Sequence, residues 1–336
     1  MVEPALPYAP APQVVLEVDD LHVEFRTERG VLKAVDGVGY TLHRGEVLAI
    51  LGESGSGKTV HARALLQILD SPPAFVTAGT AMMDDVDLLA LDEHDMQGMR
   101  GEKISMLFQD PHTALDPVFT VGDQLVELLR TRRSLSRRSA RDVAADLLDK
   151  VGIADPRGRL DNFPHQLSGG IAQRVMVAMA IALDPVVLLA DEPTSSLDVT
   201  VQAQVLELLQ QLVAEMDMAM VLITHNLAVA VGLADRIAVM YSGRLMETGP
   251  AWEVYDDPQH PYTAALLRSI PGLDRRQDRL PAIKGAPPSL LRLPSGCVFH
   301  PRCPHVIQAC KEVVPPLLEI GADRYSACIR VGEIDP

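Results

Sequence analysis

The clearest chemistry in the chain lies in one glycine-rich loop. Its residues are Gly52, Glu53, Ser54, Gly55, Ser56, Gly57, Lys58 and Thr59, and they match the pattern G-x-x-x-x-G-K-[ST] at every specified position. Glycines let backbone N–H groups turn inward around phosphate oxygens, and the positive end of a following helix faces the same point. We expect Lys58 to neutralise the β- and γ-phosphates and Thr59 to bind Mg²⁺. This segment is called the phosphate loop below.

Two consecutive acids supply the partner that a phosphate loop requires. Asp191 and Glu192 follow the apolar run 186–190. We expect that strand to carry Asp191 to the Mg²⁺ side of the nucleotide, where it acts through a metal-bound water. Glu192 can then serve as general base on the attacking water. A strand that simply ends in two solvated acids is an equal interpretation for this pair alone, but the phosphate loop favours catalysis.

A second glycine motif, Leu167–Gly170, is called the signature segment below. Its Ser168, Gly169 and Gly170 precede a helical pattern. A small serine and two glycines at a helix N-terminus can close around a γ-phosphate. The motif is weak evidence by itself, because a capping serine beside glycines is common at helix starts.

The surrounding pattern predicts the elements that position these residues. Residues 47–51 form a short apolar run that leads into the phosphate loop, and a helical pattern follows over 58–69. Strand, glycine loop and helix in this order are the context that phosphate binding needs. Further strands are expected at 14–25, 186–190, 220–224 and 237–241, with an amphipathic helix over 201–212. Strands alternating with helices predict an α/β fold with a parallel core.

The composition also predicts the domain organisation. Prolines accumulate beyond about residue 256, which indicates an extension with little regular structure. We expect a disordered lead at 1–12, a nucleotide-binding domain at 13–255 with a mainly helical subdomain at about 85–183, and a C-terminal extension at 256–336.

The motifs together resemble the ATP-binding cassette of ABC transporters, over roughly residues 14–250. They occur in the order GESGSGKT, Gln109, LSGG, LLADEP, Ser196-Leu197-Asp198 and Thr224-His225. The resemblance implies that Gln109 contacts Mg²⁺ or the attacking water, beside the surface that meets the membrane subunits. It implies that Asp198 lies at a dimer interface and that His225 contacts the γ-phosphate. It also calls for an aromatic that stacks on adenine. Phe25 is the best candidate, and a phenylalanine in a strand core is an equal interpretation.

Cassettes of this kind work in pairs. The resemblance implies that the signature segment of one cassette completes the ATP site on the phosphate loop of the other. The chain keeps Lys58, Asp191, Glu192 and His225, so its own half of the site is expected to be competent. Departures are small. Ala172 stands where peptide-importer relatives more often carry a basic residue.

The extension resembles the tail of oligopeptide and dipeptide importer ATPases. The resemblance rests on the segments His260-Pro261-Tyr262-Thr263 and Gly296-Cys297-x-Phe299-x-Pro301-Arg302-Cys303-Pro304. It implies an ATP-hydrolysing subunit that energises peptide import, peripheral on the cytoplasmic face of the inner membrane. Its partners would be a second ATPase subunit, two transmembrane permease subunits and an extracytoplasmic substrate-binding protein. The alternatives are an importer for nickel or another small solute, and a soluble ABC ATPase. The soluble kind usually has two cassettes or coiled-coil insertions, and this chain shows neither.

Four cysteines lie in the extension: Cys297, Cys303, Cys310 and Cys328. In a reducing compartment such a group favours a metal site over disulfides. Four thiolates can hold a [4Fe–4S] cluster or Zn²⁺. The resemblance implies the [4Fe–4S] cluster, because related tails carry one, and a structural role is favoured. Zn²⁺ and free or disulfide-bonded thiols are the alternatives.

The bulk properties exclude some functions. A net charge of -15 argues against general nucleic-acid binding, which needs clustered cations. The basic stretch 130–141 is interpreted as a solvated helix face. No run approaches the ~18 apolar residues of a membrane span. Residues 1–13 lack the pattern of a secretory signal. We therefore expect a cytosolic chain that reaches a membrane through partners.

Overall fold

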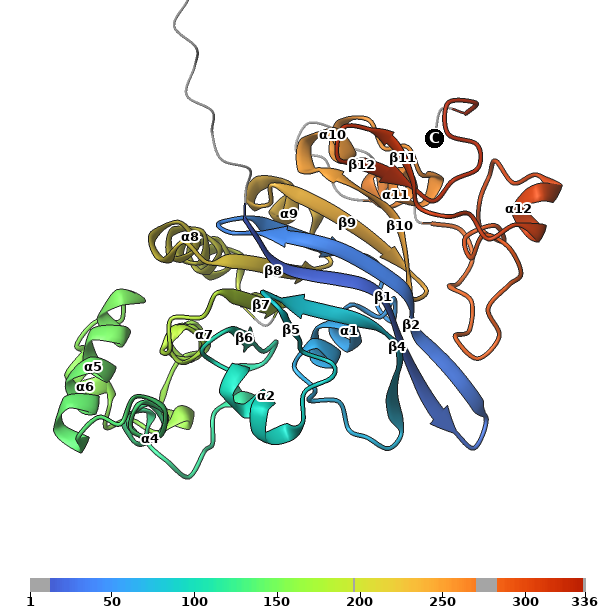
Figure 1. Ribbon diagram of the computed structural model, residues 1–336. Coiled ribbons are helices and arrows are strands. Elements are labelled where there is room, and N and C mark those ends of the chain that lie inside the picture. Colours follow the sequence, from blue (N-terminus) through green and yellow to red (C-terminus); the bar gives the residue numbers. More distant parts are fainter. Residues whose placement is uncertain (1–12, 196, 270–282, 335–336) are drawn as a thin grey trace, which may run out of the picture.

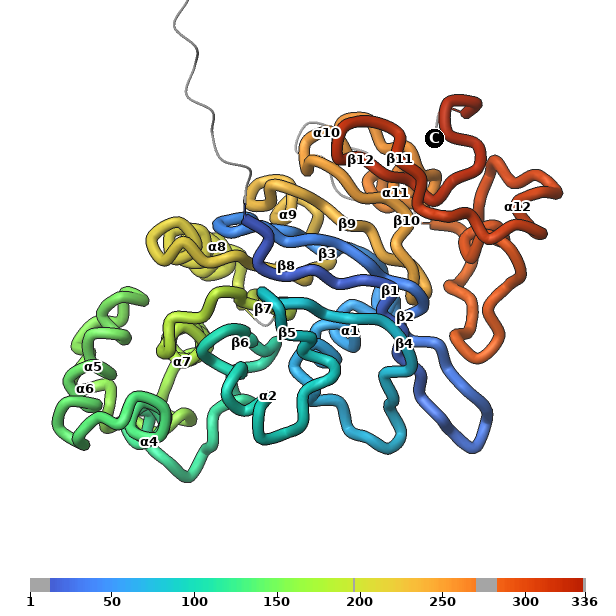
Figure 2. The backbone as a smooth tube through the Cα atoms, in the orientation of Figure 1, coloured from blue at the N-terminus to red at the C-terminus, as the bar shows by residue number. Residues whose placement is uncertain are grey.

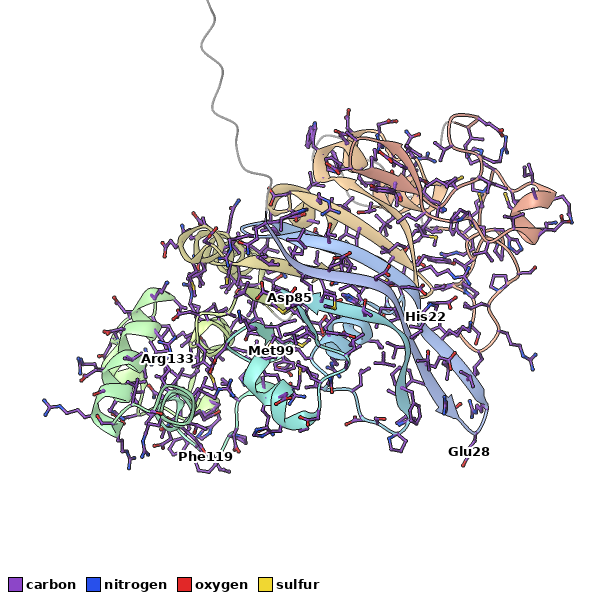
Figure 3. The ribbon with its side chains drawn as sticks, in the orientation of Figure 1. His22, Glu28, Asp85, Met99, Phe119 and Arg133 are labelled. Atoms are coloured by element: carbon purple, nitrogen blue, oxygen red, sulfur yellow. The ribbon has the colours of Figure 1, made fainter. Side chains whose placement is uncertain are left out.

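Two sheets organise the protein, as the computed structural model in Figure 1 shows. It describes residues 13–195, 197–269 and 283–334. One sheet is antiparallel and has four strands. Its order is β2 (Gly30–His43), β1 (Val14–Thr27), β4 (Ala74–Met83) and β5 (Val86–Asp87). Glu28 marks the tip of the β1–β2 hairpin in Figure 3. The predicted lead at 1–12 and Ser196 lie outside the described residues.

The second sheet has eight strands and carries the parallel core. Its order is β11 (Leu318–Gly321), β12 (Arg324–Ser326), β10 (Arg244–Pro250), β9 (Arg236–Tyr241), β3 (Val47–Leu51), β8 (Ala219–Thr224), β7 (Val187–Asp191) and β6 (Ile104–Leu107). The strands from β9 to β6 run parallel. Every residue of β3, β7 and β8 is buried, as expected for strands covered on both faces. The carboxyl ends of β3, β8, β7 and β6 consequently lie next to one another.

Two hydrophobic layers sandwich this sheet. On one side, the four-stranded sheet and α1 (Lys58–Leu65) share a core cluster with the strands, including Leu16, Ile50 and Leu65. On the other side, α7 (Gly169–Ile181) and α8 (Val199–Met216) pack through residues such as Val177 and Leu209. The core therefore fixes α1 and α7 against opposite faces of the strands that end at the site.

Helices α4 (Val121–Arg133), α5 (Arg137–Lys150) and α6 (Pro156–Arg159) form a lobe on the left of Figure 1. The short helices α2 (Glu93–Met99) and α3 (Pro111–Ala114) precede them in the chain. Figure 3 labels Phe119 and Arg133 on this lobe. The segment 85–183 is mainly helical as predicted, but its short apolar run 104–107 becomes β6 and joins the large sheet. The described helices include none that is both long and apolar enough to cross a bilayer.

Four arginines of the basic stretch have carboxylate partners nearby. Arg132, Arg133, Arg137 and Arg141 pair with Glu102, Asp184, Asp123 and Asp161, respectively. These pairs are largely exposed, so each contributes little stability. Their arrangement agrees with the prediction of a solvated helix face rather than an anion-binding surface.

The C-terminal extension has more regular structure than its prolines indicate. It contains α11 (Pro261–Arg268) and α12 (Gln308–Glu312), and it follows α10 (Ala251–Asp256). Strand β12 pairs with β10, and β11 pairs with β12, so the extension lengthens the large sheet. Figure 2 shows its red and orange backbone beside the strands of that sheet. Two strands far along the chain thus join the core that carries the phosphate loop.

Candidate active site

The phosphate loop connects the end of β3 to the start of α1, as predicted. Gly52 and Gly57 have φ values of 154° and 106°. A Cβ at Gly52 would lie 2.1 Å from the carbonyl oxygen of Met240, and one at Gly57 would lie 2.2 Å from that of Ala34. Both positions therefore require glycine, because backbone atoms block a side chain there.

Lys58 lies inside this loop. The residue is only 5% exposed. The Nζ atom donates to the carbonyl oxygens of Gly52 and Glu53 at 2.8 and 3.1 Å and to Ser56 Oγ at 3.4 Å. Burial lowers the pKa of Lys58, and the nearby carboxylates of Glu192 and Asp191 oppose that shift. The ammonium group is thus held at the centre of the loop, where phosphate oxygens can replace carbonyl oxygens as its partners.

Thr59, the last residue of the loop, and Asp191 bring together two oxygen atoms that could bind a metal ion. The Thr59 hydroxyl donates to Asp191 Oδ1 at 2.9 Å, across the gap between α1 and β7. Asp191 is 1% exposed, and burial raises the pKa of its carboxyl group. Mg²⁺ prefers hard oxygen ligands and usually takes one or two carboxylates, with phosphates and water completing its shell. The type and position of these two residues fit that ion.

Glu192 links the ends of three parallel strands. Its Oε2 accepts from Gln109 Nε2 at 3.1 Å, and its Oε1 lies 3.3 Å from His225 Nδ1. Gln109 follows β6 and His225 follows β8. Glu192 itself has a φ of 44°, a left-handed value that is unusual for a residue with a side chain and is enriched at active sites. The structure therefore joins all three predicted catalytic residues.

The signature segment is placed quite differently. Ser168 and Gly169 are exposed at the start of α7. Asp198 caps α8 by accepting from the N–H groups of Thr200 and Val201, both at 3.1 Å. Among the hydrogen bonds between described residues, none joins Ser168, Gly169 or Asp198 to the phosphate loop. Gly170 packs on α8, where a Cβ would lie 2.9 Å from Val201 Cγ1.

Phe25 is half-buried in β1 and packs against the core cluster beneath the four-stranded sheet. Its strand neighbours are Leu32 and Ala74. This position agrees with the interpretation of a phenylalanine in a strand core. Its stacking on adenine stays a prediction.

Two segments of the chain match known families. Residues 35–195 match the ABC transporter family, and residues 246–310 match the C-terminal region of oligopeptide/dipeptide transporters. The dipeptide transport ATP-binding protein DppD of Bacillus subtilis is 46% identical over 301 residues, which are 90% of each chain. The oligopeptide transport ATP-binding protein OppD of Salmonella typhimurium is 45% identical over 323 residues, or 96% of each chain.

The chain belongs to the ATP-binding proteins of oligopeptide/dipeptide ABC transporters.

Solved structures agree with this family and with the predicted α/β cassette fold. A dimeric ATP-binding cassette in a post-hydrolysis state, bound to ADP and Pi, has a TM-score of 0.63 at 26% identity. The match covers 70% of this chain and 98% of that one. A cassette of the cbiONQ transporter complex from Clostridium perfringens has a TM-score of 0.61 at 27% identity, covering 72% of this chain and 91% of its own.

Sequence reasoning missed two residues of the extension that touch the phosphate loop of this family member. The Tyr262 hydroxyl accepts from the Glu53 N–H at 3.0 Å. Arg302 binds the Glu53 carboxylate through both Nη atoms. The segments HPYT and PRCP are visible in the sequence, and both lie in the matched C-terminal region. Nothing in them indicates contact with residues more than 200 positions earlier.

The cysteines do not form a metal-ligand set. Across the part of the chain that the structure describes, no three His, Cys, Asp or Glu side chains are arranged to hold a metal ion. The described residues therefore show no metal-ligand geometry for the predicted [4Fe–4S] cluster or for its Zn²⁺ alternative. All four cysteines nevertheless are free thiols that line one pocket. Burial, with a smaller effect of the neighbouring thiols, raises the pKa of Cys297 to about 11.

Proposed function

We propose that this chain binds ATP at residues 52–59 and hydrolyses it to energise import of oligopeptides or dipeptides. The observation that carries the proposal is the convergence of Lys58, Asp191, Glu192, Gln109 and His225 at the ends of four adjacent strands. The similarity of the whole chain to DppD and OppD supports the peptide cargo. We take 13–255 as the nucleotide-binding domain and 256–336 as the extension.

In the proposed reaction, Lys58 binds the β- and γ-phosphates. Thr59 and Asp191 would hold Mg²⁺, which would supply positive charge to neutralise the phosphate oxygens. Glu192 accepts a proton from water as the water oxygen bonds to the γ-phosphorus and the bond to the ADP oxygen breaks. Gln109 and His225 already contact the two carboxylate oxygens of Glu192, so they orient this base toward the water. His225 also contacts the γ-phosphate.

The exposed signature segment supports a paired arrangement. Ser168, Gly169 and Gly170 would complete the ATP site of a second cassette, with Asp198 at the interface between the two. The dimeric form of the similar cassette bound to ADP and Pi supports this assignment. The remaining proposed partners are two permease subunits and an extracytoplasmic substrate-binding protein, which place the chain peripherally at the cytoplasmic face of the membrane.

The catalytic assignment is tested by Glu192→Gln. The amide cannot accept the proton, so turnover should fall by ~10²-fold or more, while ATP binding is retained. Single-turnover hydrolysis and equilibrium ATP binding measure the two quantities. Glu207→Gln, on α8, is the matched control. Turnover near the wild-type rate in Glu192→Gln would refute Glu192 as the base.

The cargo is tested in the reconstituted transporter. Di- and oligopeptides should stimulate ATP hydrolysis in the presence of the binding protein, and Ni²⁺ should not. Stimulation by Ni²⁺ alone would favour the alternative of a metal importer.

The cysteine pocket is proposed to hold a [4Fe–4S] cluster on Cys297, Cys303, Cys310 and Cys328, with Zn²⁺ as the alternative. The support is that all four thiols line one pocket, although they are not in ligating positions. Such a group would tie together an extension that has a small core of its own. Brown protein whose visible absorbance is lost in Cys303→Ser is the expected result. Colourless protein with stoichiometric zinc would exclude the cluster.

A further inference from the structure

Glu53, the second residue of the phosphate loop, is held on three sides. Its N–H donates to the Tyr262 hydroxyl at 3.0 Å, and its carbonyl oxygen accepts from Lys58 Nζ at 3.1 Å. Its carboxylate takes a two-pronged bond from Arg302, with Nη1–Oε2 at 2.6 Å and Nη2–Oε1 at 3.1 Å. Two of these three partners belong to the C-terminal extension. The extension therefore fixes both the backbone and the side chain of a residue that forms the ATP site.

The Arg302 side chain is buried and has several hydrogen-bond partners. Its side chain is 4% exposed, and its guanidinium group also contacts Tyr241 Oη at 3.2 Å and the carbonyl oxygen of Lys284 at 3.1 Å. Within the described residues, Glu53 is its one carboxylate partner. A buried guanidinium depends strongly on its counter-ion, and two-pronged arginine–carboxylate pairs define geometry well. The pair thus fixes Glu53 relative to the extension.

An aromatic cluster supports these contacts. The rings of Tyr241 and Tyr262 lie 4.5 Å apart, and Phe299 lies 5.4 and 5.3 Å from them. All three are almost fully buried. Tyr241 belongs to β9, Tyr262 to α11, and Phe299 to the segment between Cys297 and Cys303. The cluster therefore joins the large sheet, the extension and the cysteine pocket into one packed unit beneath Glu53.

The negative charge of Glu53 affects ATP binding. A carboxylate in a loop that receives a triphosphate repels the ligand, and the repulsion is strong where burial reduces screening. Arg302 places a compensating positive charge on both carboxylate oxygens. Without it, the negative charge of Glu53 would oppose ATP, and its side chain would be free to turn toward Lys58.

We propose that Arg302 and Tyr262 are positioning residues of the nucleotide site, through which the C-terminal extension holds the phosphate loop ready for ATP and cancels the charge of Glu53. The inference rests on the proposed binding of ATP at residues 52–59. Arg302 immediately precedes Cys303. The conformation of the cysteine-bearing segment therefore affects the ATP affinity of the same chain.

The test is equilibrium binding of ATP to the full chain. Arg302→Gln should weaken binding ~10-fold, the range of a coupling between contacting groups. Glu53→Gln should bind ATP more tightly than Arg302→Gln and within ~3-fold of wild type, because it breaks the same pair but leaves no uncompensated negative charge beside the triphosphate. Adding Glu53→Gln to Arg302→Gln should restore affinity to within ~3-fold of wild type, since no uncompensated charge is left. In hydrolysis assays Arg302→Gln should raise KM and leave kcat unchanged, and Arg302→Lys should lie between it and wild type.

Arg324→Gln is the matched control. Arg324 is another largely buried arginine of the extension, and it pairs with Glu247 and Asp257 rather than with the phosphate loop. Its replacement should leave ATP affinity unchanged. An Arg302→Gln affinity within ~2-fold of wild type, an equal loss in Arg324→Gln, or a double variant as weak as Arg302→Gln would each overturn the proposal.

Two further variants keep the outcome decisive. If Arg302→Gln does not fold, Arg302→Lys and Tyr262→Phe are judged by the same criteria, because Tyr262→Phe removes just the hydroxyl that accepts from Glu53. Lys58→Ala separates this inference from the proposed function. If Lys58→Ala binds ATP normally, the ATP site itself is wrong. If Lys58→Ala loses binding and Arg302→Gln does not, the positioning role alone is refuted.

Discussion

The phosphate loop and the signature segment are both glycine motifs at helix starts, yet they are built differently. Lys58 and Asp191 are 5% and 1% exposed and have partners within the chain. Ser168 and Gly169 are exposed, and the Ser168 side chain makes no capping hydrogen bond among the described residues. A preorganised, buried site is ready for its ligand. The exposed segment has no such partners among the described residues, which agrees with its proposed role in the ATP site of a second cassette.

The largest expected effect comes from a substitution in the buried phosphate loop. Lys58→Ala removes the ammonium group that the loop encloses. Hydrogen bonds to charged groups contribute ~1.5–3 kcal/mol each, so ATP affinity should fall by ~10²-fold or more. Equilibrium binding measures the loss, with Lys150→Ala on the exposed end of α5 as control. Unchanged ATP affinity would show that the phosphate loop is not the nucleotide site.

The next comparison is between two glycines of the same loop. A Cβ at Gly57 meets the Ala34 carbonyl oxygen at 2.2 Å, whereas a Cβ at Gly55 meets nothing within 4 Å. Gly57→Ala should therefore abolish tight ATP binding and lower the melting temperature. Gly55→Ala should cost only the ~1–2 kcal/mol of a left-handed residue. Thermal unfolding and ATP binding check both variants, and equal effects would contradict the steric argument.

A substitution in the exposed signature segment should affect the assembled transporter but not the isolated chain. The nearest atom to a Cβ at Gly169 is Leu197 Cδ2 at 3.7 Å, an ordinary contact. Gly169→Ala should leave the melting temperature and the ATP affinity of the isolated chain unchanged. In the assembled transporter, hydrolysis should fall by ~10-fold or more, because a methyl group displaces the partner's nucleotide. Full turnover in the transporter would mean that the segment does not meet a nucleotide.

The helix that starts at the loop carries an effect on stability rather than on nucleotide binding. His61 on α1 is fully buried beside Tyr40, with Nε2 and Tyr40 Oη 2.9 Å apart, and burial lowers the pKa of His61 from 6.5 to about 4. Between these values the unfolded chain binds a proton that the folded protein does not. Stability is therefore greatest above pH 6.5 and falls toward pH 4, with a slope of up to about 1.4 kcal/mol per pH unit.

Urea unfolding at pH values from 7 to 4.5 measures this dependence. His61→Gln should be less stable at neutral pH and should show a shallower loss on acidification. A slope in His61→Gln equal to that of wild type would place the titration elsewhere.

Local patterns were sufficient where the structure is local. The run before the phosphate loop became β3, and the helix after it became α1, although α1 ends at Leu65 because Gln67 adopts a left-handed φ of 51°. The antiparallel strands β2, β4 and β10 were not predicted. Strand β4 pairs with the distant β1, whereas β2 and β10 each pair with the strand just before them through a short turn. Phe25 shows the same limit, because one residue in an alternating strand can face a core or a ligand.

The sequence by itself determined the chemistry: the glycines, Lys58 and Thr59 of the phosphate loop, and the acids Asp191 and Glu192 after an apolar strand. These depend on residue type and short spacing. Only the tertiary structure decided which residues meet. The strand order brings Gln109 and His225 to Glu192, and the pairing of β12 with β10 helps bring the extension, with Arg302, to Glu53. The physical reason is that sheet order and long-range packing arise from the whole core, whereas periodicity reports only on each segment's own faces.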